Sequence, residues 1–232
     1  SGTALSATTK IGSLASSVAT VTVGNGTYNV GYDNTNATFA GILSGVTVNK
    51  YGAGTWTLTG QNSATLTIYE GKVLANASGG FTTTSPVSVR AGGTLGGSGS
   101  VKAVTVYEGG TLEASASTIS VGKFTIDGKL TLNSGSKLFI KRRASRNDLL
   151  TVTGNVQLSG ATVEIEASQP LAEGDELGIL TCGGTISGTY TLSPAIPGEG
   201  LMWDTSRFLS EGVLKVTYAT GLNRIGTDGV KI

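Results

Sequence analysis

A chain of 232 residues is long enough to bury an apolar core without disulfides or structural metal ions. Its 36 glycines follow no three-residue period, which excludes a collagen helix, and Val, Ile and Leu recur throughout, which excludes a disordered chain. The formal net charge is +1 and basic residues form no stripe with interleaved aromatics, so we expect no nucleic-acid partner. No apolar run has membrane-spanning length, so we expect no insertion of this segment into a membrane.

Short runs in which apolar residues alternate with threonines predict β-strands along the chain. The first clear run is 55–59, where Trp56 and Leu58 alternate with threonines. Similar runs follow at 65–68, 104–106, 124–126 and 162–166. Each run is bounded by Gly, Asn or Ser, and a period of two with such boundaries is typical of strands that bury one face. The sequence therefore predicts an all-β chain.

A glycine that recurs about every twenty residues indicates how these strands are connected. Gly71, Gly92, Gly109 and Gly128 hold the second position of similar turns, in steps of 21, 17 and 19 residues. One glycine corner per repeat of this length indicates coils stacked in a solenoid. A β-sandwich is the alternative, but the chain has few of the Asn-Gly and Asp-Gly loops that join hairpin strands. We predict a right-handed parallel β-helix, because crossovers between parallel strands are nearly always right-handed.

The repeat pattern predicts two sections of a single domain. We expect β-helix coils of about 20 residues over 1–170, and a closing section over 171–232, where three of the four prolines lie. The closing section is expected to cap the rod, because an uncovered solenoid end invites edge-to-edge association. Four apolar residues of the stretch 39–60 are expected to point into the coil: Val46, Val48, Trp56 and Leu58.

Four motifs occur along the chain in an order that one known family shares. Residues 11–45 lead into 50-KYGAGTWTLTG-60, and 148–165 is followed by 183–216, which contains WDTSRFLSEGVLKV. These stretches resemble the autotransporter-associated β-strand repeat, in which FxGxIxG leads into KxGxGTWTLSG and a WDTSxLxxxGxLxV strand pair closes the passenger β-helix. The resemblance covers nearly the whole chain and implies that fold. It implies no single activity, because such passengers include adhesins and stalks that carry enzymes.

The same resemblance implies a place for the protein. Passengers of this type lie outside the cell or on the outer surface of Gram-negative bacteria. The chain starts within the repeat pattern, without a signal peptide, so we expect it to be a monomeric part of a larger polypeptide. Its end, 220-TGLNRIGTDGVKI-232, resembles the join to the C-terminal sorting domain of proteins secreted by Bacteroidetes.

Residues that carry catalysis are sparse in this sequence. It has no histidine, which removes Ser-His-Asp and Cys-His sites and the usual zinc ligands, and the single Cys182 forms no internal disulfide. Among β-helix proteins the enzymatic precedent is polysaccharide cleavage, by an acidic calcium cluster with a basic residue or by paired carboxylates. Glu164 and Glu166 share a strand face and 173–176 is an acidic turn, but hydrated surface is the favoured interpretation of both. We therefore predict no catalytic residue, no metal and no cofactor.

Two groups of residues are candidates for contact with a ligand. Tyr69 and Tyr107 each precede a Glu-Gly corner, and they predict either an exposed ladder on which sugars stack or simple packing at the corner. The stretch 141–146 is expected to bulge from one coil, as a site for an acidic glycan or lipopolysaccharide or as an ordinary hydrated loop. Its basic residues are Lys141, Arg142, Arg143 and Arg146. Trp203 is expected to pack in the core or cap rather than to bind a sugar.

These observations lead to one functional hypothesis and two alternatives. The favoured one is a non-catalytic, exported β-helical module that serves as a surface stalk or adhesin-like segment, with a glycan or a cell-surface ligand as possible partner. The first alternative is a carbohydrate-binding accessory region of a secreted polysaccharide-degrading enzyme, and the second is a β-helical polysaccharide lyase. A line of exposed aromatic residues would favour the accessory region, and burial of Tyr69, Tyr107 and Trp203 would count against it.

Overall fold

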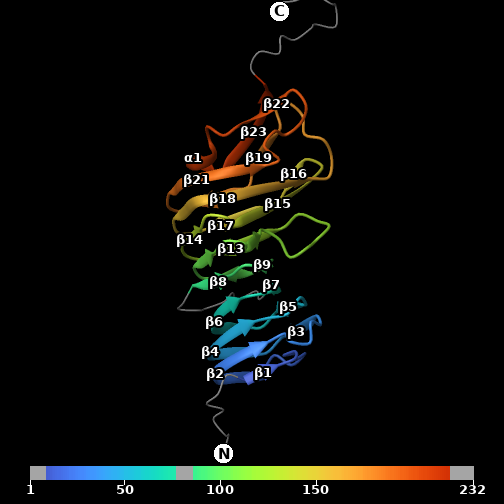
Figure 1. The fold of residues 1–232 in the computed structure, drawn as a ribbon, viewed down its shortest axis with the longest axis vertical. Helices are drawn as coiled ribbons and strands as arrows, with labels where there is room; N and C mark the ends of the chain where they lie inside the picture. Colours follow the sequence, from blue (N-terminus) through green and yellow to red (C-terminus); the bar gives the residue numbers. More distant parts are fainter. Residues whose placement is uncertain (1–8, 77–85, 220–232) are drawn as a thin grey trace, which may run out of the picture.

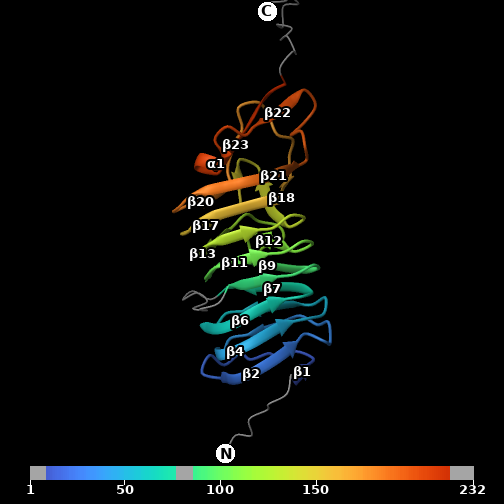
Figure 2. The same ribbon diagram turned by 60° about the vertical axis from the view of Figure 1, so that its left-hand side comes forward.

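The protein is an elongated all-β solenoid. The computed structural model describes residues 9–76 and 86–219, and in these ranges parallel strands stack in about seven turns with one short helix. The coils succeed one another along the long axis, from β1 (Thr9–Ile11) to the sheet that holds β22 (Leu201–Asp204) and β23 (Val213–Tyr218) (Figure 1). The view turned by 60° shows the same order (Figure 2). The prediction of an all-β, parallel β-helix is confirmed.

Strands of successive coils pair in three faces, which we call A, B and C. Face A holds β1, β2 (Thr22–Val30), β4 (Ile42–Lys50), β6 (Asn62–Ile68), β8 (Val87–Val89), β11 (Val104–Val106), β14 (Leu130–Leu132) and the first halves of β18 (Val156–Ala167) and β21 (Ile186–Ser193). Face B holds β3 (Ala37–Phe39), β5 (Thr55–Leu58), β7 (Gly71–Ala75), β9 (Gly93–Gly97), β12 (Thr111–Glu113), β15 (Lys137–Arg143) and the second halves of β18 and β21. Face C holds β10 (Ser100–Val101), β13 (Lys123–Ile126), β17 (Leu149–Val152) and β20 (Leu180–Cys182). The turn from face A to face B of each coil is the AB corner.

The register shows that the coils lengthen toward the C-terminus. In face A, Val48 pairs with Leu66, 18 residues further on, whereas Leu158 pairs with Gly188, 30 residues further on. The added residues lie between faces B and C, where longer connections join the strands of later coils. A solenoid tolerates such insertions because each coil needs only its face strands in register with the neighbouring coils.

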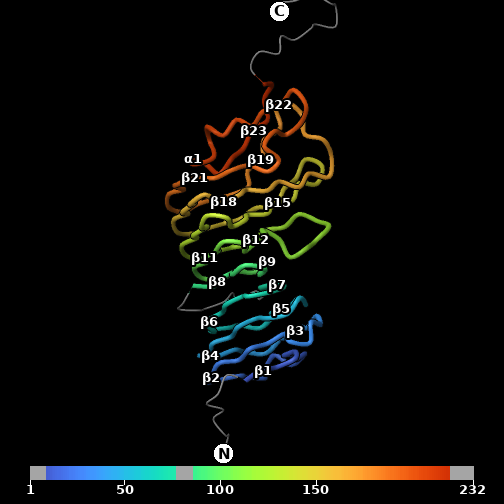
Figure 3. The backbone as a smooth tube through the Cα atoms, viewed as in Figure 1, coloured from blue at the N-terminus to red at the C-terminus, as the bar shows by residue number. Residues whose placement is uncertain are grey.

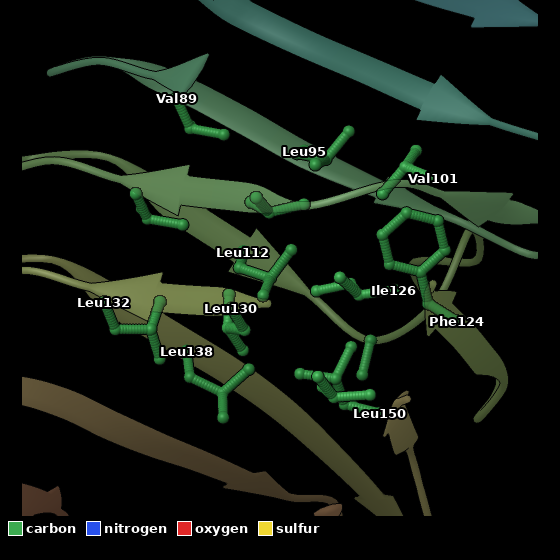
Figure 4. Packing of buried hydrophobic residues seen from close by; sticks show 14 of the residues in the cluster. Val89, Leu95, Val101, Leu112, Phe124, Ile126, Leu130, Leu132, Leu138 and Leu150 are labelled. Atoms are coloured by element: carbon green, nitrogen blue, oxygen red, sulfur yellow. The ribbon is translucent and has the colours of Figure 1, made fainter. Parts of the chain in front are cut away.

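The core follows from the alternation that the sequence shows. Val46, Val48, Trp56 and Leu58 are at most 2 % exposed, as predicted, and the threonines between them lie at the surface or half-buried. Figure 4 shows the same arrangement further along the rod, where Leu112, Leu130 and Leu138 and their neighbours fill the space between the faces. Each such side chain contributes about 1.5–3 kcal/mol when it is fully buried, so the repeated core dominates the stability.

A column of glycines marks the AB corner. Gly71, Gly92 and Gly109 have φ values of 68°, 82° and 72°, and the N–H of each donates to the carbonyl of the next glycine in the column. The fourth predicted member was wrong, because Gly128 lies in the turn between β13 and β14, from face C to face A. Gly135 takes its place and accepts from the Gly109 N–H at 3.0 Å. The sequence step to Gly128 resembles one repeat because this coil carries a face C strand that adds a second glycine turn.

Two longer connections leave the rod between faces B and C. The tube in Figure 3 shows the connection from β12 to β13 projecting from its side, with Ile119 81 % exposed. One coil later, β15 extends past its coil and folds back as an antiparallel hairpin with β16 (Arg146–Asn147). The bulge predicted at 141–146 is this hairpin.

The C-terminal end of the rod is closed by an antiparallel sheet and a single helical turn. After residue 170 the chain first adds one more coil, β20 and β21, and the cap sheet has the order β19 (Glu176–Gly178), β23, β22. The helix α1 (Phe208–Glu211) ends at Gly212, whose φ is 71° and whose N–H donates to the Phe208 carbonyl. Phe208 is fully buried and meets Tyr190 of the last coil edge to face at 4.6 Å between ring centroids. The tail 220–232, with its resemblance to a sorting-domain join, lies outside the described residues.

Candidate ligand-binding surface

Five side chains of the AB corner form a column along the rod, which we call the tyrosine–arginine column. It consists of Tyr32, Tyr51, Tyr69, Arg90 and Tyr107. The first two rings are stacked with their centroids 5.2 Å apart, and the rings of Tyr51 and Tyr69 are stacked at 4.9 Å with an interplanar angle of only 3°. Arg90 lies over the ring of Tyr107, with Cζ 3.7 Å from the centroid. Tyr69 and Tyr107, the two predicted contacts, thus belong to one structure.

The register of face A produces this column. Each of its last four members directly follows the final residue of a face A strand, and those final residues are aligned by parallel pairing of Lys50 with Ile68, Ile68 with Val89 and Val89 with Val106. The spacing between paired strands, about 4.8 Å, is also a good distance for stacked rings. Aromatic side chains at this position therefore stack whenever successive coils carry them.

The column exposes the edges of its rings and covers their faces. Tyr32 and Tyr69 are 41 % and 39 % exposed, and Tyr51 and Tyr107 are half-buried. Burial raises the pKa of Tyr51, and the neighbouring Tyr69 and Tyr32 raise it further. A sugar that stacked on the face of Tyr51 would have to displace a neighbouring ring. A ladder is present, but its ring faces are occupied by one another, so only the edges and hydroxyl groups meet solvent.

Lys50 holds the same corner from the inside. It occupies a core position that the neighbouring coils fill with Val30 and Ile68, and it is only 1 % exposed. Its Nζ donates to the carbonyls of Tyr51 and Gly52, both at 2.7 Å, and of Glu70 at 3.3 Å. Burial lowers the pKa of Lys50, and the carboxylates of Glu70 and Asp33 oppose that shift. The interpretation of the sequence missed this residue, although its signal was a lysine at the position where other strands end in an aliphatic residue.

The basic stretch 141–146 does not form a surface patch. Lys141 is 2 % exposed, and its Nζ pairs at 3.1 Å with Asp148, which is fully buried. Asp148 also accepts from the backbone N–H groups of Gly122 and Lys141, so it ties the hairpin to the preceding connection. Arg142 is 6 % exposed and pairs with Asp175 at 2.7 Å. The prediction that these two residues contact a surface ligand was wrong in physical terms, because both are buried inside the fold.

The other two basic residues of the stretch lie further out. Arg143 pairs with Glu166 and donates to the carbonyl of Ile119, which anchors the projecting connection. Arg146 is exposed and has no ion pair within residues 9–76 and 86–219. The four predicted contacts are therefore divided between the interior and the surface, and they present no common face to a ligand.

The candidate carboxylates are engaged in ion pairs. Glu164 pairs with Lys137 at 2.6 Å, and Glu166 pairs with Arg143. In the acidic turn, Asp175 pairs with Arg142, and Glu176 lies 3.1 Å from Arg207. No group of three His, Cys, Asp or Glu side chains in the described part of the chain is arranged to hold a metal ion.

Two hollows flank the loop that follows β21. One, of about 450 Å³, lies against Ile165, Leu171 and Pro194, and the other, of about 490 Å³, lies against Tyr190, Met202 and Trp203. Trp203 is 7 % exposed and its Nε1 donates to the Pro194 carbonyl at 3.0 Å, so it packs in the cap as predicted. The hollows are bordered mainly by apolar side chains of the cap.

No protein-family model matches this chain, and no curated protein matches it either. Within the described residues, no helix has the length and apolar character needed to cross a membrane.

Proposed function

We propose that this chain is a non-catalytic, exported β-helical module that acts as a stalk or adhesin-like segment of a larger bacterial surface protein. The observation that carries the proposal is the parallel ladder of hydrogen-bonded strands that runs through faces A and B from the first coils to β21. Such a rod grows by about 4.8 Å with each coil, so its length depends on coil number and not on folding of one central core.

The pairing of the candidate carboxylates supports a non-catalytic role. Glu164 and Glu166 are bound to Lys137 and Arg143, and a glycosidase needs one carboxyl to give up a proton and another to act as base or nucleophile. Cations beside both groups favour the charged form of each, which works against a proton donor. The favoured interpretation of these residues is a hydrated strand face with ion pairs.

The motifs shared with autotransporter passengers support export to the cell surface. In 50-KYGAGTWTLTG-60, Lys50 locks the AB corner, and the Trp56 indole donates to the Leu14 carbonyl of the first coil at 2.8 Å. Residues with such roles suit a repeat that builds rods. Location outside the cell or on the outer surface of a Gram-negative bacterium, and membership of that passenger family, belong to this proposal.

A length series tests the stalk. Because Val48 and Leu66 are register partners, residues 48–65 form one repeat, and two further copies inserted after Thr65 should lengthen the rod by about 10 Å. Small-angle X-ray scattering of the full chain and of the insertion variant measures this change. An unchanged maximum dimension would contradict a rod whose length is set by coil number.

An activity screen tests the non-catalytic assignment. The full chain is incubated with a panel of neutral and acidic polysaccharides, with and without calcium, and release of reducing ends and of unsaturated products is followed. We expect no cleavage. Turnover that Glu164→Gln or Glu166→Gln abolished would overturn the assignment and favour the enzymatic alternative.

A further inference from the structure

We propose that the tyrosine–arginine column binds an extended neutral polysaccharide, laid along the rod axis with one sugar residue for each coil. This is a binding function beyond that of a spacer, and it does not depend on the stalk proposal. It develops the alternative of a carbohydrate-recognising region from the contacts of Tyr32, Tyr51, Tyr69, Arg90 and Tyr107.

The spacing of the column is the first argument. Its stacked rings repeat at 5.2 and 4.9 Å, which follows from the distance between coils. An extended polysaccharide chain repeats its sugar residues at a comparable interval. A polymer that lies along the column therefore meets a similar group at every residue, and no register is lost over several coils.

Unpaired polar groups are the second argument. The hydroxyls of Tyr32, Tyr51, Tyr69 and Tyr107 have no hydrogen-bond partner in the part of the chain that the structure describes. Each phenol can both donate and accept, which suits sugar hydroxyls. A row of free hydroxyls on rings that are held rigid by stacking costs little side-chain entropy to bind.

Arg90 is the third argument, because it is a half-buried cation without an anion. Its guanidinium lies flat on Tyr107, its Nε is buried without an acceptor, and it makes no ion pair with any described residue. Stacking on Tyr107 stabilises the charge and leaves the outer N–H groups of the planar fork free. These groups can bind two neighbouring sugar oxygens in the middle of the column.

The surrounding charges favour a neutral polymer over an acidic one. Tyr69 and Tyr107 are each followed by an exposed glutamate, Glu70 and Glu108. Two carboxylates on either side of Arg90 repel a polyanion, and they can accept hydrogen bonds from sugar hydroxyls. The column thus alternates donors and acceptors, as a neutral polysaccharide requires.

Contacts made by ring edges are individually weak, so binding should grow with the number of coils engaged. Because the ring faces are covered, stacking of sugars contributes little and each coil adds only about one hydrogen-bonded contact. We expect affinity to rise from disaccharide to hexasaccharide for a ligand that matches the column, since successive contacts act on one polymer.

The test removes hydroxyl groups and keeps the stack. Cellohexaose, mannohexaose and xylohexaose are titrated into the full chain by calorimetry, alongside the acidic probe heparin hexasaccharide. At least one neutral hexaose should bind, and Tyr32→Phe, Tyr51→Phe and Tyr69→Phe combined should weaken it by about tenfold or more, because up to three hydrogen bonds are lost. The thermal midpoint should not fall, since phenylalanine rings stack as tyrosines do.

Two controls make the outcome specific. Tyr190→Phe changes a tyrosine outside the column that packs on Phe208, and it should leave neutral hexaose binding unchanged. Arg90→Lys keeps the charge but loses the planar fork, so it should weaken binding with only a small change in stability. Absence of binding by all three neutral hexaoses, binding of the heparin probe alone, or undiminished binding by the triple phenylalanine variant would overturn the proposal, while leaving the length series of the stalk unaffected.

Discussion

At the scale of single residues, the AB corner combines two demands that a sequence seldom meets together. The backbone turns with a left-handed residue, and the carbonyls that the turn releases have to be satisfied. The glycine column meets the first demand at Gly71, Gly92 and Gly109. Lys50 meets the second in one coil, where its buried ammonium binds three carbonyls.

Replacing Lys50 by methionine should therefore destabilise the protein. The substitution leaves the Tyr51 and Gly52 carbonyls without a donor in a buried corner, and we expect a loss of about 1–3 kcal/mol in the free energy of unfolding. The matched control is Ile68→Met at the register partner, which changes only packing and should cost less than about 1.5 kcal/mol. Urea titration of both variants compares them, and equal losses would show that the ammonium contacts contribute nothing.

The same pair of proteins gives a pH dependence whose sign is known. Burial lowers the pKa of Lys50 in the folded state below its ordinary 10.5, so the unfolded chain binds this proton more tightly. Stability from this group therefore rises with pH between the lowered pKa and 10.5. The difference in unfolding free energy between wild type and Lys50→Met should grow in favour of wild type over that window. Taking the difference cancels the tyrosines, and a difference that shrank as pH rose would contradict the assigned shift.

Two glycines of the same column should differ in how they tolerate alanine. A Cβ on Gly92 would lie 3.6 Å from its nearest neighbour, so Gly92→Ala should cost only the left-handed strain, about 1–2 kcal/mol. A Cβ on Gly71 would lie 2.3 Å from the Gly52 carbonyl oxygen, so Gly71→Ala should cost about 3 kcal/mol or more. Thermal unfolding of the two variants measures the contrast. If both melted alike, close packing of the corners would not be the reason for glycine.

At the scale of elements, the β15–β16 hairpin depends on a buried ion pair. Asp148 is fully buried beside the Lys141 ammonium and accepts two backbone N–H groups. Asp148→Asn removes the countercharge of a buried lysine and should cost about 3–5 kcal/mol. Glu166→Gln breaks a more exposed pair with Arg143 and should cost less than about 1 kcal/mol. Chemical denaturation distinguishes the two, and a mild Asp148→Asn would mean that the hairpin is held by packing alone.

At the scale of the whole molecule, the cap decides whether the rod ends. β21 pairs with β18 on one side, and in the described residues its other edge meets no strand. The cap packs Trp203, Phe208 and the strand β23 over this end of the core. An uncovered edge of this length is a template for another strand.

Truncation should convert this end into an association site. A chain that stops after Ser193 loses the cap and exposes core residues such as Leu180 and Ile186, so we expect concentration-dependent oligomers in sedimentation velocity. A chain that stops after Ala219 keeps the cap and is the control, with the sedimentation of the full chain. Monomeric behaviour of the Ser193 truncation at all concentrations would show that the cap is not needed to block the edge.

The sequence by itself determined the period, the inward positions and the class of fold. Alternation at Trp56 and Leu58 reports which side chains avoid water, and the recurring glycine reports where the backbone turns, because both are properties of single residues and their nearest neighbours. The glycine step failed only at Gly128, where an added strand introduced a second kind of turn.

What only the tertiary structure decided was which residues from different coils meet. Register between coils stacked Tyr51 on Tyr69 and brought Arg90 over Tyr107, and the folded-back hairpin buried Lys141 against Asp148. A basic stretch reads as surface in a sequence, because a charge usually stays in water unless a partner is available. The partner lay seven residues away across a turn, and its carboxylate became a partner only when the hairpin closed.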